Sequence, residues 1–213
     1  MKFAFAAVCM LALVSIANAD AVEGAVKTLE ASGICKDDGL FPANGTQIRK
    51  QKTCVSLQIG EIPTADNMVS AIIIEPRNNQ RIPSNQPFFV RTKISNLDTG
   101  FFSDPTIDYY QIPQTLNDNG QIQGHSHITI QKIDGKSVPD PTVFAFFKGL
   151  NDKADNGVLS VNVTTGLPSA GLYRICTMNA SNSHQPVVMP VAQRGSQDDC
   201  IRVNVVPPKS RRN

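Results

Sequence analysis

Residues 124–131, G-H-S-H-I-T-I-Q, carry two histidines separated by one serine. Side chains alternate between the two faces of a β-strand, so His125 and His127 share one face, with the spacing that is found in half of a zinc or copper site. His184 is the remaining histidine and is the candidate third ligand. The isoleucines of this segment define the opposite, inward face. The pattern therefore favours a polar outer strand face, with a metal site at His125, His127 and His184 as the alternative.

Catalytic motifs are missing from the rest of the sequence. There is no G-x-S-x-G, no H-E-x-x-H and no phosphate-binding glycine loop. The carboxylates of Asp198 and Asp199 are adjacent, and adjacent strand residues face opposite ways, so they cannot flank one glycosidic bond. A polysaccharide-cleaving copper oxidase requires histidine as its first mature residue, and the predicted mature chain begins with a different residue. We predict a protein that is not an enzyme and that needs no cofactor.

The first 19 residues have the pattern of a secretory signal peptide. Lys2 precedes an apolar run, and Ala17-Asn18-Ala19 is a small-x-small cleavage site. No later stretch approaches the roughly 20 apolar residues of a membrane span. Without residues 1–19 the chain has 19 bases against 18 acids, and its basic residues are not interleaved with aromatics, so we expect no nucleic-acid partner and no membrane association. The predicted location is extracellular.

Cysteines and sequons agree with secretion. Four cysteines remain after the signal peptide, an even number that favours two disulfides in an oxidising compartment. Three connectivities are open, and the two short loops, Cys35 with Cys54 and Cys176 with Cys200, are preferred. Three N-glycosylation sequons begin at Asn44, Asn162 and Asn179.

The chain after residue 53 has a period of two, interrupted by Pro, Gly and Asn, which is typical of β-strands. Eight strands are predicted, at 54–59, 68–75, 88–95, 125–133, 142–147, 157–163, 172–178 and 200–206. Without helical crossovers they indicate an all-β fold, an antiparallel immunoglobulin-like or fibronectin-like β-sandwich. Tyr173, placed shortly before Cys176, is similar to the tyrosine corner of such domains.

The predicted organisation is a signal peptide at 1–19, an N-terminal arm with a short helix at 20–53, the β-sandwich at 54–206 and a basic tail at 207–213. The connection at 96–124 is longer than structureless loops usually are. It is rich in aromatic residues, so we expect it to pack over the open end of the sandwich.

Four segments within residues 54–206 have a distinctive composition: G-F-F-S-D-P-T-I-D-Y-Y-Q-I-P-Q, G-Q-I-Q-G-H-S-H-I-T-I, F-A-F-F-K-G-L and H-Q-P-V-V-M-P-V-A-Q-R-G-S-Q-D-D-C. In these segments the chain resembles a family of small fungal secreted proteins, the rust transferred proteins. The resemblance implies a non-catalytic effector that is transferred towards a host cell, inhibits cysteine proteases and forms filaments.

Two segments match those implied activities. Asn162-Val163-Thr164-Thr165-Gly166 is similar to the Asn-Pro-Thr-Thr-Gly loop with which chagasin-type inhibitors enter a papain-type protease. Val163 stands where those inhibitors have proline, and an ordinary turn carrying a sequon is the simpler interpretation. The apolar segments 71–75 and 143–147 would allow self-association if they lay at an exposed sheet edge, although core strands explain them as well.

Overall fold

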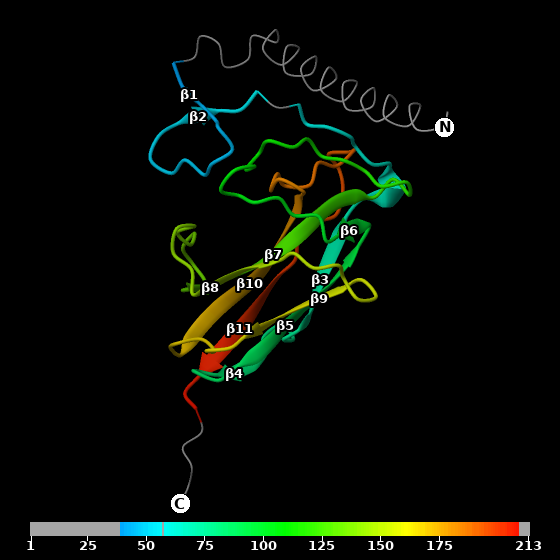
Figure 1. Cartoon of the computed structure of the whole chain (residues 1–213). Coiled ribbons are helices and arrows are strands. Elements are labelled where there is room, and N and C mark those ends of the chain that lie inside the picture. The colour runs from blue at the N-terminus through cyan, green and yellow to red at the C-terminus, as the bar shows by residue number, and fades with distance from the viewer. Residues whose placement is uncertain (1–38, 57, 209–213) are drawn as a thin grey trace, which may run out of the picture.

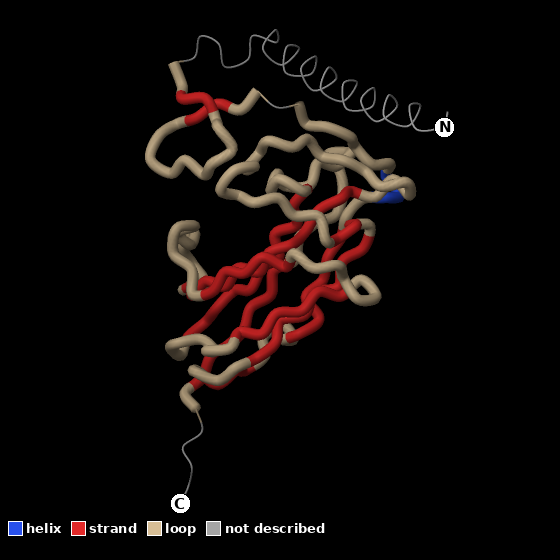
Figure 2. Tube along the Cα trace, in the orientation of Figure 1, coloured by secondary structure: helices blue, strands red, loops and turns tan. Residues whose placement is uncertain are grey.

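A computed structural model describes residues 39–56 and 58–208 of the chain. These residues form a sandwich of two main β-sheets, with loops gathered at one end (Figures 1 and 2). The elements are β1 (Phe41–Pro42), β2 (Thr53–Cys54), the single-turn 3₁₀ helix η1 (Ala65–Asn67), β3 (Ser70–Glu75), β4 (Arg81–Pro83), β5 (Phe88–Ser95), β6 (Leu97–Thr99), β7 (Ile122–Ile133), β8 (Phe146–Leu150), β9 (Val158–Val163), β10 (Gly171–Ser181) and β11 (Cys200–Val206). The all-β sandwich prediction is confirmed.

The larger sheet has the strand order β4-β11-β10-β7-β6, and β8 pairs with β7 beside β6. The smaller sheet has the order β3-β5-β9. Most pairs are antiparallel, as predicted, but β4 with β11, β6 with β7 and the separate pair β1 with β2 are parallel. The larger sheet is therefore mixed, because two short strands join its edges after long connections instead of hairpins.

Between the sheets lies one apolar core. Alternate residues of each strand point inward, so Ile128 and Ile130 of β7 meet Val90 of β5, and all three side chains are fully buried. Tyr173 of β10 is also buried, and its hydroxyl donates to the carbonyl of Ser169, 3.1 Å away. A hydrogen bond from the tyrosine hydroxyl to the backbone a few residues upstream is characteristic of the tyrosine corner, the motif to which this stretch of sequence is similar.

The strand predictions hold best for the long strands. The segments predicted at 88–95 and 200–206 have the observed bounds of β5 and β11. The segment predicted at 142–147 is displaced, because β8 begins only at Phe146. The segment predicted at 54–59 is wrong as a long strand, since β2 ends at Cys54.

Residues 96–124 contribute β6, and their aromatic part then packs at the end of the sandwich where the loops gather (Figure 1). There the loop also covers the first part of β7, because Phe102 packs against His125. The described part of the arm packs on this loop through a hydrogen bond from the Tyr109 amide to the Gly45 carbonyl, 2.7 Å long. Gly45 is required there, because a Cβ atom would meet the Ile107 carbonyl oxygen at 1.8 Å.

Several predictions concern residues that the structure does not describe. The signal peptide, the short helix at 21–32 and the end of the basic tail lie outside the described residues. Within the described ranges, no helix has the length and apolar character needed to cross a bilayer.

Candidate metal centre

The three histidines converge on the outer side of β7, although they are far apart in the sequence. His125 and His127 follow each other on the outward face of β7, and His184 comes from the turn after β10. Each ring offers one nitrogen, and these three nitrogens all lie within 4.8 Å of one another. The prediction that His125 and His127 share the outer face is confirmed. That face is not a plain solvated surface, however, because His125 is fully buried and His127 is 9% exposed.

Backbone carbonyl groups hold one nitrogen of each ring. Nδ1 of His125 lies 3.0 Å from the Phe101 carbonyl, and Nδ1 of His127 lies 3.1 Å from the Met178 carbonyl. Nε2 of His184 lies 3.0 Å from the Ser103 carbonyl. A carbonyl oxygen only accepts, so each of these nitrogens carries the proton. The lone pairs are therefore on Nε2 of the two strand histidines and on Nδ1 of His184.

Two of these lone pairs face each other at short range. His125 Nε2 and His184 Nδ1 are 3.1 Å apart. With both rings in the tautomers that the carbonyls select, neither nitrogen has a proton to give, and a cation between them relieves the repulsion. A single proton can be shared by only two of these nitrogens, whereas a metal ion can be bound by all three. Metal-bound histidines characteristically donate their other N–H to a carbonyl or carboxylate, as all three rings do here.

Burial keeps the two strand histidines neutral. Loss of solvation, together with the neighbouring His127 and His184 rings, lowers the pKa of His125 to about 3. Burial also lowers the pKa of His127. Both rings are therefore uncharged at neutral pH, which is the protonation state that binds a metal ion.

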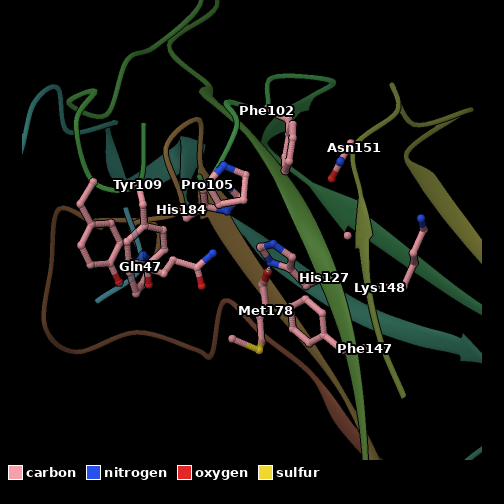
Figure 3. A pocket seen from close by; sticks show the side chains of 13 residues that line it. Gln47, Phe102, Pro105, Tyr109, His127, Phe147, Lys148, Asn151, Met178 and His184 are labelled. Carbon is pink, nitrogen blue, oxygen red and sulfur yellow. Dashed lines mark hydrogen bonds between the residues drawn. The ribbon is translucent and has the colours of Figure 1, made fainter. Parts of the chain in front are cut away.

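Aromatic side chains surround the three rings. Phe102 packs edge-on against His125 and His184, with ring centroids 5.1 and 5.2 Å apart. Phe147 of β8 stacks on His127 at 5.3 Å. A cavity of about 460 Å³ opens beside the cluster, with His127 and His184 in its wall. Figure 3 shows these two rings between Phe102, Phe147 and Tyr109.

The 162–166 loop is remote from this centre. It begins with the last two residues of β9 and continues into the following turn, at the end of the sandwich where β10 begins and β11 ends. Asn162, Thr164 and Thr165 are exposed, while Gly166 is buried with a positive φ of 66°. A Cβ atom at Gly166 would meet the Gln86 backbone at 2.4 Å, so the packing of this turn requires glycine at position 166. The chagasin-like inhibitory role remains a prediction.

The structure bears on two predicted kinds of covalent feature, the disulfides and the glycosylated asparagines. Cys176 and Cys200 form a disulfide between paired positions of β10 and β11, as preferred. Cys54 is also disulfide-bonded, and its predicted partner Cys35 lies outside the described residues. Asn44 and Asn162 are exposed, but Asn179 is 2% exposed and its amide donates to the Gln197 carbonyl. A glycan at Asn179 is incompatible with this fold, because a sugar attached there would have to displace that buried contact.

The two apolar segments considered for self-association both lie at sheet edges. Segment 71–75 belongs to edge strand β3, where the Ile73 amide donates to the Asp199 carboxylate at 2.8 Å. Because that bond already uses an outward-pointing amide of the edge strand, this amide is not available to pair with a strand of another molecule. Segment 143–147 runs into edge strand β8. Filament formation remains a prediction.

The fold and site thus define a β-sandwich with a buried three-histidine cluster beside an aromatic cavity. Residues 71–206 match a family described as the CLU5d N-terminal domain, and the chain belongs to that family. It is 46% identical over 167 residues to "Pathogenicity cluster 5 protein d" of Colletotrichum graminicola. The match covers 76% of this chain and 34% of that protein, so the chain spans about a third of its relative. The family is a fungal, pathogenicity-related one.

Solved structures are only distantly similar. The soluble domain of PmoD from a Methylocystis species aligns with a TM-score of 0.34 and 10% identity, covering 65% of this chain and 89% of that one. A superoxide reductase (neelaredoxin) from Ignicoccus hospitalis aligns with a TM-score of 0.30 and 11% identity, covering 64% and 80%. Likenesses this weak carry no argument about function.

Proposed function

We propose that this chain is a secreted, virulence-related protein that acts by binding, without catalysis, and that His125, His127 and His184 hold a transition-metal ion. The observation that carries the metal proposal is the 3.1 Å approach of His125 Nε2 to His184 Nδ1. These are the two nitrogens that carry no proton in the tautomers favoured by the Phe101 and Ser103 carbonyls. The pathogenicity-cluster relative supports the virulence-related role.

The donor set favours zinc or copper. Three imidazoles are borderline donors that suit zinc and copper, whereas magnesium and calcium prefer carboxylate and carbonyl oxygens. Tetrahedral zinc with Zn–N bonds of about 2.0 Å places its ligand nitrogens about 3.3 Å apart. One pair already lies at 3.1 Å, and all three nitrogens lie within 4.8 Å of one another, so small movements of the rings would bring them to this spacing.

Metal content is the direct test. The chain has three histidines, all in the cluster, so the protein must be purified without a histidine tag. We expect about one equivalent of zinc or copper by mass spectrometry, and at least about 100-fold weaker binding in His184→Gln. Thr129→Val is the matched control, because Thr129 is the next outward position of β7. Equal metal affinity of His184→Gln and the wild type would overturn the proposal.

Protease inhibition by the 162–166 loop is the second proposal, supported by the exposure of Thr164 and Thr165 at a rigid turn and by the likeness to rust transferred proteins. A rigid loop loses little entropy on binding. The test is titration of a papain-type protease with wild-type and Thr164→Ala, Thr165→Ala protein, with and without N-glycans. Stoichiometric inhibition that the double variant loses would support this role, and no inhibition by either glycoform would end it.

A further inference from the structure

The cavity beside the histidine cluster has the features of an organic-ligand site. Its volume of about 460 Å³ lies in the range of small-molecule pockets. Three large apolar side chains that line it, Phe102, Phe147 and Met178, are 40–47% exposed. Exposed apolar side chains gathered around one hollow indicate a binding site more strongly than scattered ones do. Figure 3 shows Phe102 and Phe147 on opposite sides of the His127 ring.

Backbone strain is concentrated at the same place. Six described residues other than glycine have a positive φ, and four of them are asparagines, which tolerate this conformation well. The other two are Tyr110, at 59°, and His184, at 76°, and both line the cavity. Their conformations are held by hydrogen bonds from their amides to the Ser183 and Ser181 carbonyls. Such strain is characteristic of ligand sites, where it preorganises side chains.

The lining selects a flat anion. Tyr109 and Tyr110 stack with ring centroids 4.2 Å apart, and with Phe147 they offer aromatic faces on which a planar ring can pack. Among the described residues that line the cavity there is no carboxylate, and Lys148 is the one lysine. A metal ion at the cluster would add further positive charge at the cavity wall.

The metal ion would also have room for a ligand oxygen. Three protein nitrogens leave a fourth position of a tetrahedral ion open. His125 is fully buried, whereas His127 and His184 line the cavity, so the open position faces the cavity. We propose that this cavity binds a planar aromatic carboxylate, with its ring among Phe147, Tyr109 and Phe102 and its carboxylate on the histidine-bound metal ion. This inference rests on the proposed metal function.

Benzoate is the probe, and cobalt(II) is the reporter metal. Cobalt(II) bound by three histidines has a visible spectrum that responds to a new oxygen ligand. We expect benzoate to change the spectrum of the cobalt-loaded protein, and calorimetry to show binding on the order of tenfold tighter than to metal-free protein. Cyclohexanecarboxylate tests the need for a flat ring, and benzamide tests the need for the negative charge.

Matched variants test which side chain the aromatic ring of benzoate contacts. Phe147→Leu should weaken benzoate binding by about fivefold, since an aromatic pair contributes about 1 kcal/mol beyond its buried area. Phe144→Leu is the control, because Phe144 is similarly exposed and does not line the cavity. Both variants should still bind cobalt, which shows that they remain folded at the site.

The outcomes separate this inference from the metal function. A protein that binds cobalt while benzoate changes neither the spectrum nor the heat overturns the ligand site and leaves the metal function standing. Equal benzoate affinity with and without cobalt overturns coordination by the metal. Failure to bind any metal overturns the proposed function and the coordination together.

Discussion

The outer faces of the two sheets begin from the same kind of sequence and end in different environments. On β7, alternation places His125 and His127 outward, and on β5 it places Phe89, Arg91 and Lys93 outward. His125 is fully buried, whereas Phe89 is 43% exposed. The strand pattern decides which side chains share a face. A segment elsewhere in the chain decides whether that face meets water.

The cover over β7 is built from loops that are tied to one another by buried polar groups. The side-chain amide of Gln114 donates to the Glu61 and Val188 carbonyls, at 2.8 and 3.0 Å, and its oxygen accepts from the Val188 amide at 2.8 Å. The Ser183 hydroxyl donates to the Ile112 carbonyl at 2.7 Å. These bonds join the loop after β6, the strand-like stretch before η1 and the turn after β10. The outer face of the smaller sheet has no comparable cover among the described residues.

The largest expected effect is the loss of folding stability at low pH, which should come from the β7 face and its buried histidine. The pKa of His125 is about 3 in the folded protein, below its ordinary value of 6.5, because burial disfavours the charged ring. Between these two values the unfolded chain binds more protons, so stability is complete above about pH 6.5 and falls as the pH is lowered towards 3. In metal-free protein we expect His125 to contribute a loss of roughly 2 to 3 kcal/mol between pH 7 and pH 4.5.

Urea unfolding in the presence of a chelator measures this loss. The His125→Gln variant should lose less stability over the same pH interval, because glutamine does not titrate. Carboxylates titrate equally in both proteins, so the difference in slope isolates the histidine. Identical pH slopes for wild type and variant would mean that the β7 face is open to water in solution.

Removing the central tie of the cover should come next in size. Gln114 is 1% exposed, and Gln114→Ala leaves the part-buried Val188 amide and two carbonyls without their partner. A buried polar group left unpaired costs about 1–3 kcal/mol, so we expect the free energy of unfolding to fall by about 3 kcal/mol. Gln193→Ala, at an exposed glutamine, should change it by less than about 0.5 kcal/mol.

Hydrogen exchange would show where the Gln114→Ala effect acts. We expect faster exchange at Glu61 and Val188, whose amides lie in the cover, and unchanged exchange in β5 of the smaller sheet. Destabilisation spread evenly over both sheets would contradict the view that the cover is a separate layer on β7.

Replacing the two sequon asparagines that lie on strands should change the free energy of unfolding by a smaller amount. Asn179 is buried in β10, and Asn162 is exposed on β9. Asn179→Ala removes the hydrogen bond to the Gln197 carbonyl and should cost about 1–2 kcal/mol without changing the mass of glycans on protein from a fungal host. Asn162→Ala should leave stability unchanged and remove one glycan. A glycan found on Asn179 would show that β10 is reached by the glycosylation machinery before it folds.

The sequence predicted the strands whose alternation is long enough to recognise. The pattern of β5 and β11 indicates their bounds, and the tyrosine before Cys176 pointed to a similarity with the tyrosine corner. It missed β4 and β6, because three residues are too few to show a period of two. Their parallel pairing depends on long-range packing, which local pattern does not encode.

The candidate site was only half visible in the sequence. Period two places His125 and His127 on one face, and His184 was the single remaining histidine. Their convergence depends on the positive φ of His184 and on the carbonyls of Phe101 and Ser103, which arrive with the long loop. Neither feature leaves a periodic signal. The aromatic residues of that loop were the available clue, although their position over β7 was not predictable.

The smallest effect is expected on the exposed face. Arg91 pairs with Glu75 at 2.6 Å, with the two side chains 46% and 43% exposed, and its guanidinium lies 5.3 Å from the centre of the Phe89 ring. Exposed ion pairs contribute about 0–1 kcal/mol, so Arg91→Ala should lower the free energy of unfolding by less than about 1 kcal/mol, and by less still in high salt. A double-mutant cycle with Glu75→Ala measures the coupling. A coupling above about 2 kcal/mol would mean that this face is shielded from water in solution as β7 is, because only a desolvated pair is that strong.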